Sequence, residues 1–193
     1  MMSQPSSATA AVRTKRLTLR PLRLEDADEL KRCMIEGAIG ETMISTPDNV
    51  NDESARAWIA ARLPSSQSHD LHLAICESAD DRRAIGYVGV VHVDPVHGEG
   101  ELTFWLGRDA RGKGYASEAA KSVAAHALGP FGLNRLCAHH MVGNDASGGV
   151  LARLGFKPEG VLRQRVRKRG AFHDVALLSL LRDDLNASDG DIN

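Results

Sequence analysis

The chain has 193 residues, 42% of them hydrophobic and 25% charged, which suits one globular domain with a proper core. Its net charge of −1 gives no global field that would attract nucleic acid or an anionic membrane, and no apolar run approaches membrane-spanning length. Its three cysteines, Cys33, Cys76 and Cys137, are odd in number and widely spaced, which argues against a disulfide framework or a zinc site and favours the reducing cytoplasm.

Both ends of the chain are rich in small and polar residues. We therefore expect residues 1–13 and 187–193 to be disordered tails. The start lacks the compact apolar block of a signal peptide. Between the tails we find no internal repeat, and we predict that residues 14–186 form a single domain.

The N-terminal part of the chain predicts one strand and two helices. Residues 16–22 are typical of a short strand. Residues 24–36 predict a helix, because acidic residues fill its first turn and Gly37 follows its end. Residues 38–50 carry turn chemistry, and residues 51–63 predict a second helix.

The middle of the chain predicts strands. Residues 70–78 alternate between apolar and polar, and residues 84–93 suit the strand paired to them. The DDRR sequence at 80–83 is expected to form the hairpin turn between them. Residues 98–107 predict the next strand.

The C-terminal half alternates helices and strands. A helix follows residue 114 and carries an apolar face at i, i+3, i+4, i+7 spacing. That face consists of Ala116, Ala119, Ala120, Val123, Ala124, Ala127 and Leu128. A strand over 134–142 and a helix over 144–155 come next, and a final hairpin over 156–181 turns near Gly170. Hairpins together with a strand–helix–strand crossover over 98–142 predict a mixed α/β sheet.

A glycine-rich loop joins the 98–107 strand to the alanine-rich helix. Gly112 and Gly114 let the backbone approach a ligand closely, and Arg111 and Lys113 can add charge-assisted hydrogen bonds. Free N–H groups at the start of a helix bind anions, so the loop suits a phosphate. The alternative is a tight turn whose basic residues are merely solvated.

Four segments resemble, in order and spacing, the GNAT acetyltransferases. Arg111, Gly114 and Ala116 fit the [QR]xxGx[GA] motif with which that family binds pyrophosphate. The other segments resemble its RimJ/RimL-type branch: RLTLRPLRLEDADEL, GELTFWLGRDARGKGYASEA and NDASGGVLARLGFKPEGVLR. The resemblance covers roughly residues 15–182. It implies a mixed, mostly antiparallel twisted sheet of about seven strands, with flanking helices and a splayed central parallel pair.

The resemblance implies acetyl-coenzyme A as the cosubstrate. Backbone groups near Trp105 and Leu106 would pair with the pantetheine arm in the gap between the splayed strands, and one free N–H there would polarise the thioester carbonyl. The pyrophosphate would lie on residues of the loop and of the helix start. These are Arg111, Gly112, Lys113, Gly114, Tyr115 and Ala116.

Glu101 is the first catalytic candidate, because RimJ/RimL-like sequences carry a strand glutamate facing the acceptor at this position. A carboxylate there would remove the proton of the amine, directly or through water. Strand periodicity places Glu99, Glu101 and Thr103 on one face, which makes Glu99 the second choice. The alternative is that Glu101 is an ordinary solvent-facing strand residue.

Ser147 is the second catalytic candidate, as the proton donor to the departing coenzyme A thiolate, and Asn144 would contact the pantetheine arm. Many GNAT enzymes use a tyrosine for the proton, but that position is Leu151 here. Asn144 and Ser147 equally suit a helix N-cap and first turn. Gly148 and Gly149 depart from the bulky or basic residues usual in the family, which leaves open their effect on coenzyme affinity.

The acceptor side is expected to involve the last hairpin. Four arginines alternate along its first strand and are expected on one face, either solvated or as an electropositive wall beside the acceptor. They are Arg163, Arg165, Arg167 and Arg169. In the second reading Arg165 and Arg167 bind carboxylates of the acceptor. Asp174 is expected to have a structural or acceptor-binding role. His139 and His140 adjoin on a strand and face opposite sides, so no metal is expected.

These observations predict N-acetylation of an amine by direct transfer in a ternary complex. Cys137 is the cysteine placed to carry an acetyl group, but it lacks an evident activating partner. A protein N-terminal amine is the first choice of acceptor, followed by a small-molecule amine such as an antibiotic, a polyamine or an amino acid. A non-catalytic acyl-coenzyme A sensor is the third reading, against which Glu101 and Ser147 argue. We expect a monomer or homodimer without nucleic-acid or membrane partners.

Overall fold

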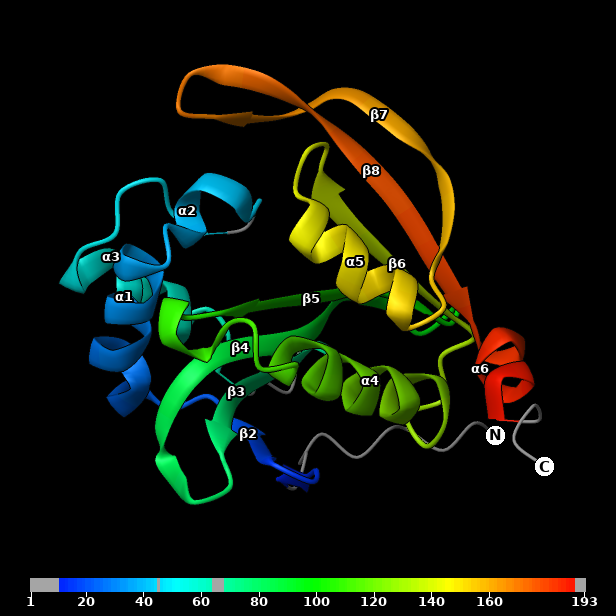
Figure 1. Ribbon diagram of the computed structural model, residues 1–193, viewed down its shortest axis with the longest axis horizontal. Coiled ribbons are helices and arrows are strands. Elements are labelled where there is room, and N and C mark those ends of the chain that lie inside the picture. Colours follow the sequence, from blue (N-terminus) through cyan, green and yellow to red (C-terminus); the bar gives the residue numbers. More distant parts are fainter. Residues whose placement is uncertain (1–10, 45, 64–67, 190–193) are drawn as a thin grey trace.

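The computed structural model describes residues 11–44, 46–63 and 68–189, and its strands form one eight-stranded sheet (Figure 1). The strands are β1 (Val12–Arg13), β2 (Leu17–Pro21), β3 (Leu71–Glu77), β4 (Asp80–Asp94), β5 (Glu99–Leu106), β6 (Arg135–Met141), β7 (Lys157–Lys168) and β8 (Ala171–Leu181). The helices are α1 (Ala27–Glu36), α2 (Ile39–Thr42), α3 (Asp52–Ala60), α4 (Tyr115–Leu128), α5 (Asp145–Arg153) and α6 (Arg182–Asp189). Two short 3-10 turns are η1 (Leu24–Asp26) and η2 (Arg108–Ala110).

The sheet has the order β1-β2-β3-β4-β5-β6-β8-β7 and is antiparallel except between β5 and β6. The predicted mixed, mostly antiparallel sheet is therefore confirmed. The eighth strand is β1, which lies in the expected N-terminal tail and pairs Val12 with Leu19. At the other end, α6 runs three residues into the expected C-terminal tail. Residues 1–10 and 190–193 of those tails lie outside the described residues.

The parallel pair is short, and this shapes the molecule. Pairing joins Glu99–Glu101 of β5 to Arg135–Cys137 of β6, although β5 continues to Leu106 and β6 to Met141. Beyond Glu101 and Cys137 the two strands separate, as the splayed central pair predicted. The separation opens a gap in the middle of the sheet (Figure 1).

Different helices cover the two faces of the sheet, each through hydrophobic contacts. On one face, α4 and α5 pack on β2–β6 and β8, and the alanine-rich stripe of α4 lets the helix lie close to the strands. On the other face, α1 and α3 pack on β3, β4 and β5 through Trp58, Tyr87 and Trp105. The two tryptophans and Tyr87 lie within 6.3 Å of one another by ring centroid.

Two local predictions differ from the structure in the first half of the chain. The β3–β4 turn lies at residues 78–79 rather than at DDRR, because bulges around Cys76 bring Glu77 opposite Asp80. DDRR therefore begins β4. The segment 38–50, expected to form turns, contains the single helical turn α2.

The prediction that four alternating arginines share one face of the strand is wrong. A bulge interrupts β7, because Leu162 pairs with Val175 whereas Val166 pairs with His173, which leaves extra residues on the β7 side. Gln164 within the bulge has a φ of 49°, and such a conformation breaks the alternation of side chains. Arg169 lies beyond the strand in the hairpin turn, with a φ of 48°.

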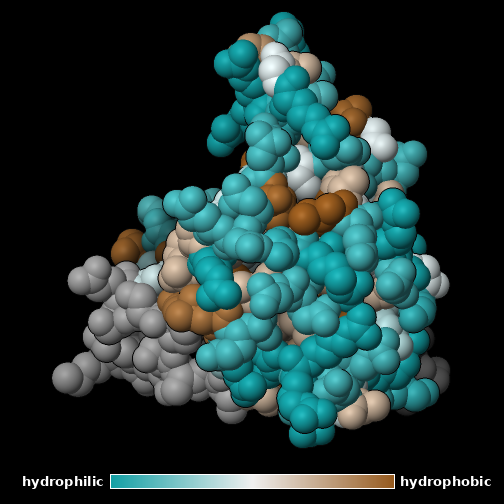
Figure 2. Space-filling model, turned by 90° about the vertical axis from the view of Figure 1, so that its left-hand side faces the viewer, coloured by the Kyte–Doolittle hydropathy of each residue, from teal (hydrophilic) through white to brown (hydrophobic). Residues whose placement is uncertain are grey.

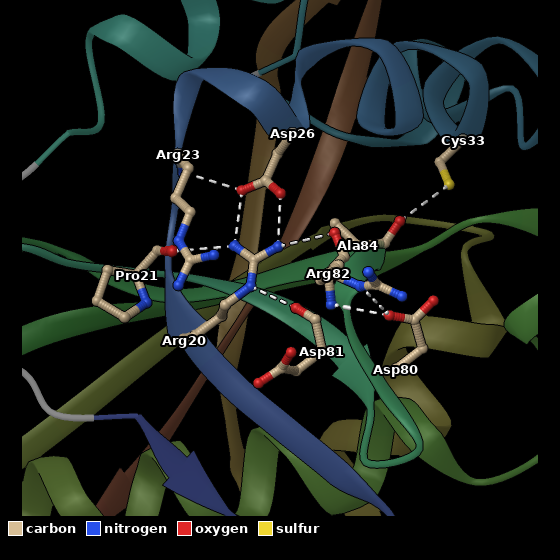
Figure 3. A network of polar contacts seen from close by, with 9 residues as sticks. All are labelled: Arg20, Pro21, Arg23, Asp26, Cys33, Asp80, Asp81, Arg82 and Ala84. Atoms are coloured by element: carbon tan, nitrogen blue, oxygen red, sulfur yellow. Dashed lines mark hydrogen bonds and ion pairs between the residues drawn. The ribbon is translucent and has the colours of Figure 1, made fainter.

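A buried ion pair fixes α1 to the sheet (Figure 3). Arg20 of β2 donates from Nη2 to Asp26 Oδ1 at 2.6 Å and from Nη1 to Oδ2 at 2.9 Å, and both side chains are 3% exposed. Asp26 also accepts from the Arg23 N–H at 2.9 Å, while Arg20 Nε donates to the Asp81 carbonyl at 2.7 Å. The entry to α1 and the start of β4 therefore depend on one guanidinium.

We predict that Asp26→Asn destabilises the fold by about 3–5 kcal/mol, because it leaves the Arg20 charge buried without its counterion. The measurement is the free energy of unfolding in urea. Glu36→Gln is the matched control, since Glu36 pairs with Arg32 at 2.8 Å but its side chain is 46% exposed. That exposed pair should contribute less than about 1 kcal/mol. Equal losses in the two variants would contradict the assignment.

Candidate active site

The gap between β5 and β6 leads into a cavity of about 540 Å³. Its walls come from the end of β5, the glycine-rich loop, α2 and the first turns of α4 and α5. Most residues predicted to bind the coenzyme line it: Trp105, Leu106, Arg111, Gly112, Gly114, Tyr115, Ala116, Asn144 and Ser147. Lys113 instead lines a smaller pocket of about 130 Å³ beside α1.

The loop needs its two glycines for its backbone conformation. Gly112 has a φ of 74° and Gly114 a φ of 80°, in the region that L side chains rarely adopt. Gly114 is the N-cap of α4, and its carbonyl accepts the N–H of Glu118 at 3.1 Å. The N–H groups of the first α4 turn have no partner within the helix and lie at the cavity, which suits an anionic ligand.

Arg111 differs from the expectation that its guanidinium is free for phosphate. Its Nη2 donates to the Gly37 carbonyl at 2.6 Å and its Nε to the Leu106 carbonyl at 3.1 Å. Burial and the charge of Arg108 lower its pKa. The side chain therefore ties the end of α1 to the end of β5, where the cavity begins.

The start of α5 places Asn144 and Ser147 at the cavity. Asn144 is the N-cap, and its Oδ1 accepts the N–H of Ser147 at 3.3 Å. Leu151 is a buried core residue and has no contact with the cavity. Gly149 lines the cavity, whereas a Cβ on Gly148 would lie 3.2 Å from His140 Nε2, which favours glycine there.

Glu101 lies where β5 and β6 separate, on the sheet face that also carries Trp105, since alternate strand residues share a face. Its side chain is 23% exposed, with Oε1 at 3.2 Å from His139 Nδ1 and Oε2 at 3.2 Å from His92 Nδ1. Burial by itself would raise the pKa of Glu101, but the hydrogen bonds and charges of His139 and His92 outweigh burial and lower it. A carboxylate at this place is therefore ionised at neutral pH.

Cys137 is the register partner of Glu101 across the parallel pair. Burial, together with the charges of Glu101 and Glu99, raises the pKa of the Cys137 thiol to about 11. The side chain is therefore a thiol at neutral pH and a poor nucleophile. Glu99, the second choice of base, is 48% exposed and lies 3.4 Å from Arg135 Nε.

Sequence reasoning missed the grouping of His92, His139 and Cys137 around Glu101. His139 was expected to face the side opposite His140. Its contact with Glu101 of β5 depends on the register between β5 and β6, which cannot be derived from the sequence. His92 has a φ of 52° at an irregularity of β4, and local sequence gives no signal for that conformation. The sequence predicted no metal, with His139 considered only together with His140; in the structure Glu101, Cys137 and His139 come together as side chains that could ligate a metal.

The β7–β8 hairpin projects beyond the sheet, and its tip is mostly hydrophilic (Figure 2). Arg165 and Arg167 are exposed on it. Lys168 Nζ donates to the Thr46 carbonyl at 2.7 Å and to Asp48 at 2.8 Å, and Arg169 pairs with Glu41 at 2.8 Å, so the tip is fastened to the segment that follows α1. Asp174 accepts the Gln164 N–H at 2.7 Å and so holds the bulge of β7.

Comparison with known families identifies the protein family to which the chain belongs. Residues 16–157 match the family described as Acetyltransferase (GNAT) domain. The chain belongs to the GNAT acetyltransferase family. It is an acetyl-coenzyme A-dependent N-acetyltransferase.

Curated relatives of this GNAT chain are N-acetyltransferases. The uncharacterized N-acetyltransferase p20 of Bacillus licheniformis is 32% identical over 170 residues, which cover 88% of this chain and 94% of p20. The ribosomal-protein-serine acetyltransferase of Escherichia coli is 29% identical over 99 residues, which cover 51% of this chain and 55% of that enzyme.

The fold of the GNAT chain also agrees with solved structures. RimL, a ribosomal alpha-N-protein acetyltransferase in complex with coenzyme A, superposes with a TM-score of 0.81 at 19% identity. The match covers 91% of this chain and 99% of RimL. Within the described residues of the GNAT domain, none of the helices has the length and apolar character needed to cross a bilayer.

The glycine-rich loop predicts how the GNAT domain responds to its cosubstrate. Acetyl-coenzyme A should raise the melting temperature, as a ligand selective for the native state does. Gly114→Asp should abolish the rise, because a carboxylate at the helix start repels the pyrophosphate and L side chains disfavour a φ of 80°. Differential scanning fluorimetry measures both effects.

Gly170→Asp is the matched control, since Gly170 has a φ of 82° and open space around it but lies in the β7–β8 turn. It should keep the full rise. Loss of the rise in Gly170→Asp, or its retention in Gly114→Asp, would contradict the assignment of the loop.

Proposed function

We propose that this chain transfers the acetyl group of acetyl-coenzyme A to a protein N-terminal amine, by direct transfer in a ternary complex in the cytoplasm. The observation that carries the proposal is the half-buried carboxylate of Glu101 at the point where β5 and β6 separate. The cavity, lined by Ser147 and the glycine-rich loop, lies mainly on the side of α4 and α5 and also reaches α2. Glu101 lies on the sheet face opposite α4 and α5. The coenzyme and the amine would thus reach the gap from opposite faces.

On the coenzyme side, the cavity residues have complementary roles. The edge of β5 that β6 leaves open near Trp105 and Leu106 would pair with the pantetheine amides, although the Leu106 carbonyl already accepts from Arg111 Nε. An N–H on this edge would stabilise the thioester oxygen as it gains charge. Asn144 would contact the arm. Gly112, Gly114, Tyr115 and Ala116 would hold the pyrophosphate through backbone N–H groups.

On the acceptor side, Glu101 would bind the incoming amine and accept its proton through water or through His139. Attack of the neutral amine on the thioester carbon forms the N–C bond and breaks the C–S bond, and Ser147 would donate a proton to the departing sulfur. An α-amine has a pKa of about 8 and a lysine side chain one of about 10.4, so an α-amine reaches the neutral form more readily. This chemistry supports an N-terminal amine as the acceptor.

We predict that Glu101→Gln lowers kcat by about 10²–10⁴-fold with little change in acetyl-coenzyme A affinity. Because the pKa of Glu101 is lowered, its carboxylate stays ionised across neutral pH, and raising the pH should partly restore the variant by deprotonating the amine without help. The measurement is the pH–rate profile of acetyl transfer to an N-terminal peptide amine.

Glu99→Gln is the matched control, since Glu99 is two residues earlier on the same strand face but more exposed. It should keep the wild-type profile. A Glu101→Gln enzyme whose profile matches wild type would remove Glu101 from the reaction.

The projecting hairpin supports an acceptor with acidic residues near its amine. Arg165 and Arg167 are exposed, while Lys168 and Arg169 are engaged by Asp48 and Glu41. Arg167 stacks over the Phe172 ring at 5.9 Å, a contact that leaves its N–H groups available to carboxylates. A relative acting on a ribosomal protein agrees with a protein acceptor.

We predict that the double substitution Arg165→Gln and Arg167→Gln raises KM for acidic peptides several-fold and leaves neutral peptides unchanged, which is the mark of lost uniform binding. Added salt should weaken the preference in wild type. Steady-state kinetics on matched acidic and neutral peptides measure it.

Arg82→Gln with Arg83→Gln is the matched control, because these exposed arginines lie on β4 at its hairpin with β3, away from the β7–β8 hairpin (Figure 1). The control should leave both peptides unaffected. If the Arg165/Arg167 double substitution affected acidic and neutral peptides equally, these arginines would have no role in binding acidic acceptors.

A further inference from the structure

Three different metal-ligating side chains lie together on the sheet face that carries Glu101. They are Glu101, Cys137 and His139, and their possible ligand atoms all lie within 4.8 Å of one another. All three are partly buried, with the Glu101 and His139 side chains 23% and 21% exposed. The group is therefore sheltered by protein and still reachable from solvent.

Strand topology explains why these residues meet. Glu101 and Cys137 are direct register partners at the last rung of the parallel pair, and His139 is two residues further along the same face of β6. Because the strands separate beyond this rung, no backbone pairing with β5 continues past Cys137. The sheet itself thus holds the three side chains around a common point.

We propose that Glu101, Cys137 and His139 bind one zinc-like divalent cation, and that the bound cation closes the acceptor side of the gap. Thiolate, imidazole and carboxylate together suit zinc better than magnesium or calcium, which prefer oxygen ligands alone. Ligand atoms on one tetrahedral zinc lie roughly 3.3–3.6 Å apart. The 3.2 Å contact between Glu101 Oε1 and His139 Nδ1 is already close to this spacing.

A fourth ligand is within reach. His92 Nδ1 lies 3.2 Å from Glu101 Oε2 and its side chain is 80% exposed, so it can turn toward the cation or leave that position to water. Binding releases the thiol proton of Cys137 to solvent, and neutral His139 offers Nδ1 to the cation with its proton on Nε2. The two positive charges of the cation offset the thiolate and the carboxylate. No bond of the substrate changes in this step.

The bound cation would coordinate the Glu101 carboxylate and so make it unavailable to the acceptor amine. This consequence rests on the proposed function of Glu101, whereas cation binding itself does not. Inhibition should therefore be competitive with the amine and not with acetyl-coenzyme A. The site would make the transfer sensitive to free zinc.

The test titrates the full chain with Cd²⁺ in the absence of coenzyme A, whose thiol itself binds metals. Wild type should show a saturable cadmium–thiolate absorption band at one equivalent, which Zn²⁺ displaces. Cys137→Ser should lose the band, and His139→Asn should weaken binding on the order of 10-fold or more. Cys33→Ala is the matched control, since Cys33 of α1 is buried against Ala84 of β4, and this variant should keep the band. No saturable band, or an unchanged band in Cys137→Ser, would overturn the site.

A second measurement follows acetylated peptide by mass spectrometry with and without Zn²⁺, each variant compared with its own zinc-free rate. Zinc should inhibit wild type competitively with the peptide, and Cys137→Ser should need a much higher zinc concentration. Cadmium binding without inhibition would overturn the blocking of the acceptor and count against the role of Glu101. Absence of binding, with Glu101→Gln still slow, would overturn the cation site and leave the proposed function intact.

Discussion

The short parallel pairing between β5 and β6 is the constraint on which the rest of the structure depends. Three residues of each strand pair, and then the strands separate. A continuous parallel pair would satisfy the backbone of both strands and close the sheet. Because the pairing stops at Glu101 and Cys137, backbone groups along the end of β5 remain available, and the cavity can open through the sheet rather than beside it.

Separation of the strands also divides the chemistry between two faces. Helices α4 and α5 cover one face and bring the glycine-rich loop, Asn144 and Ser147 to the cavity. Helices α1 and α3 cover part of the other face, which carries Glu101, Cys137 and His139. A donor and an acceptor that approach from opposite faces can meet at the carboxylate without competing for one entrance.

Charged contacts hold the outer parts of the molecule in place around this gap. Arg111 joins the ends of α1 and β5 through two backbone carbonyls, and Lys168 joins the β7–β8 tip to Thr46 and Asp48. Arg20 and Asp26 fix the entry to α1. These basic residues serve the architecture, whereas Arg165 and Arg167 remain exposed. A basic residue beside a site therefore cannot be assigned to a ligand before its partners are known.

The sequence by itself determined what depends on local backbone and on strand period. Gly112 and Gly114 before an alanine-rich helix predicted a close-turning loop, and both have a positive φ. The hairpins and the strand–helix–strand crossover predicted the mixed sheet. Tertiary structure decided what depends on register. A bulge at Gln164 dispersed the predicted arginine face, and internal carbonyls took the guanidinium of Arg111. The pairing of Glu101 with Cys137 and His139 joins residues more than thirty positions apart, and neither strand carries a local signal for the other.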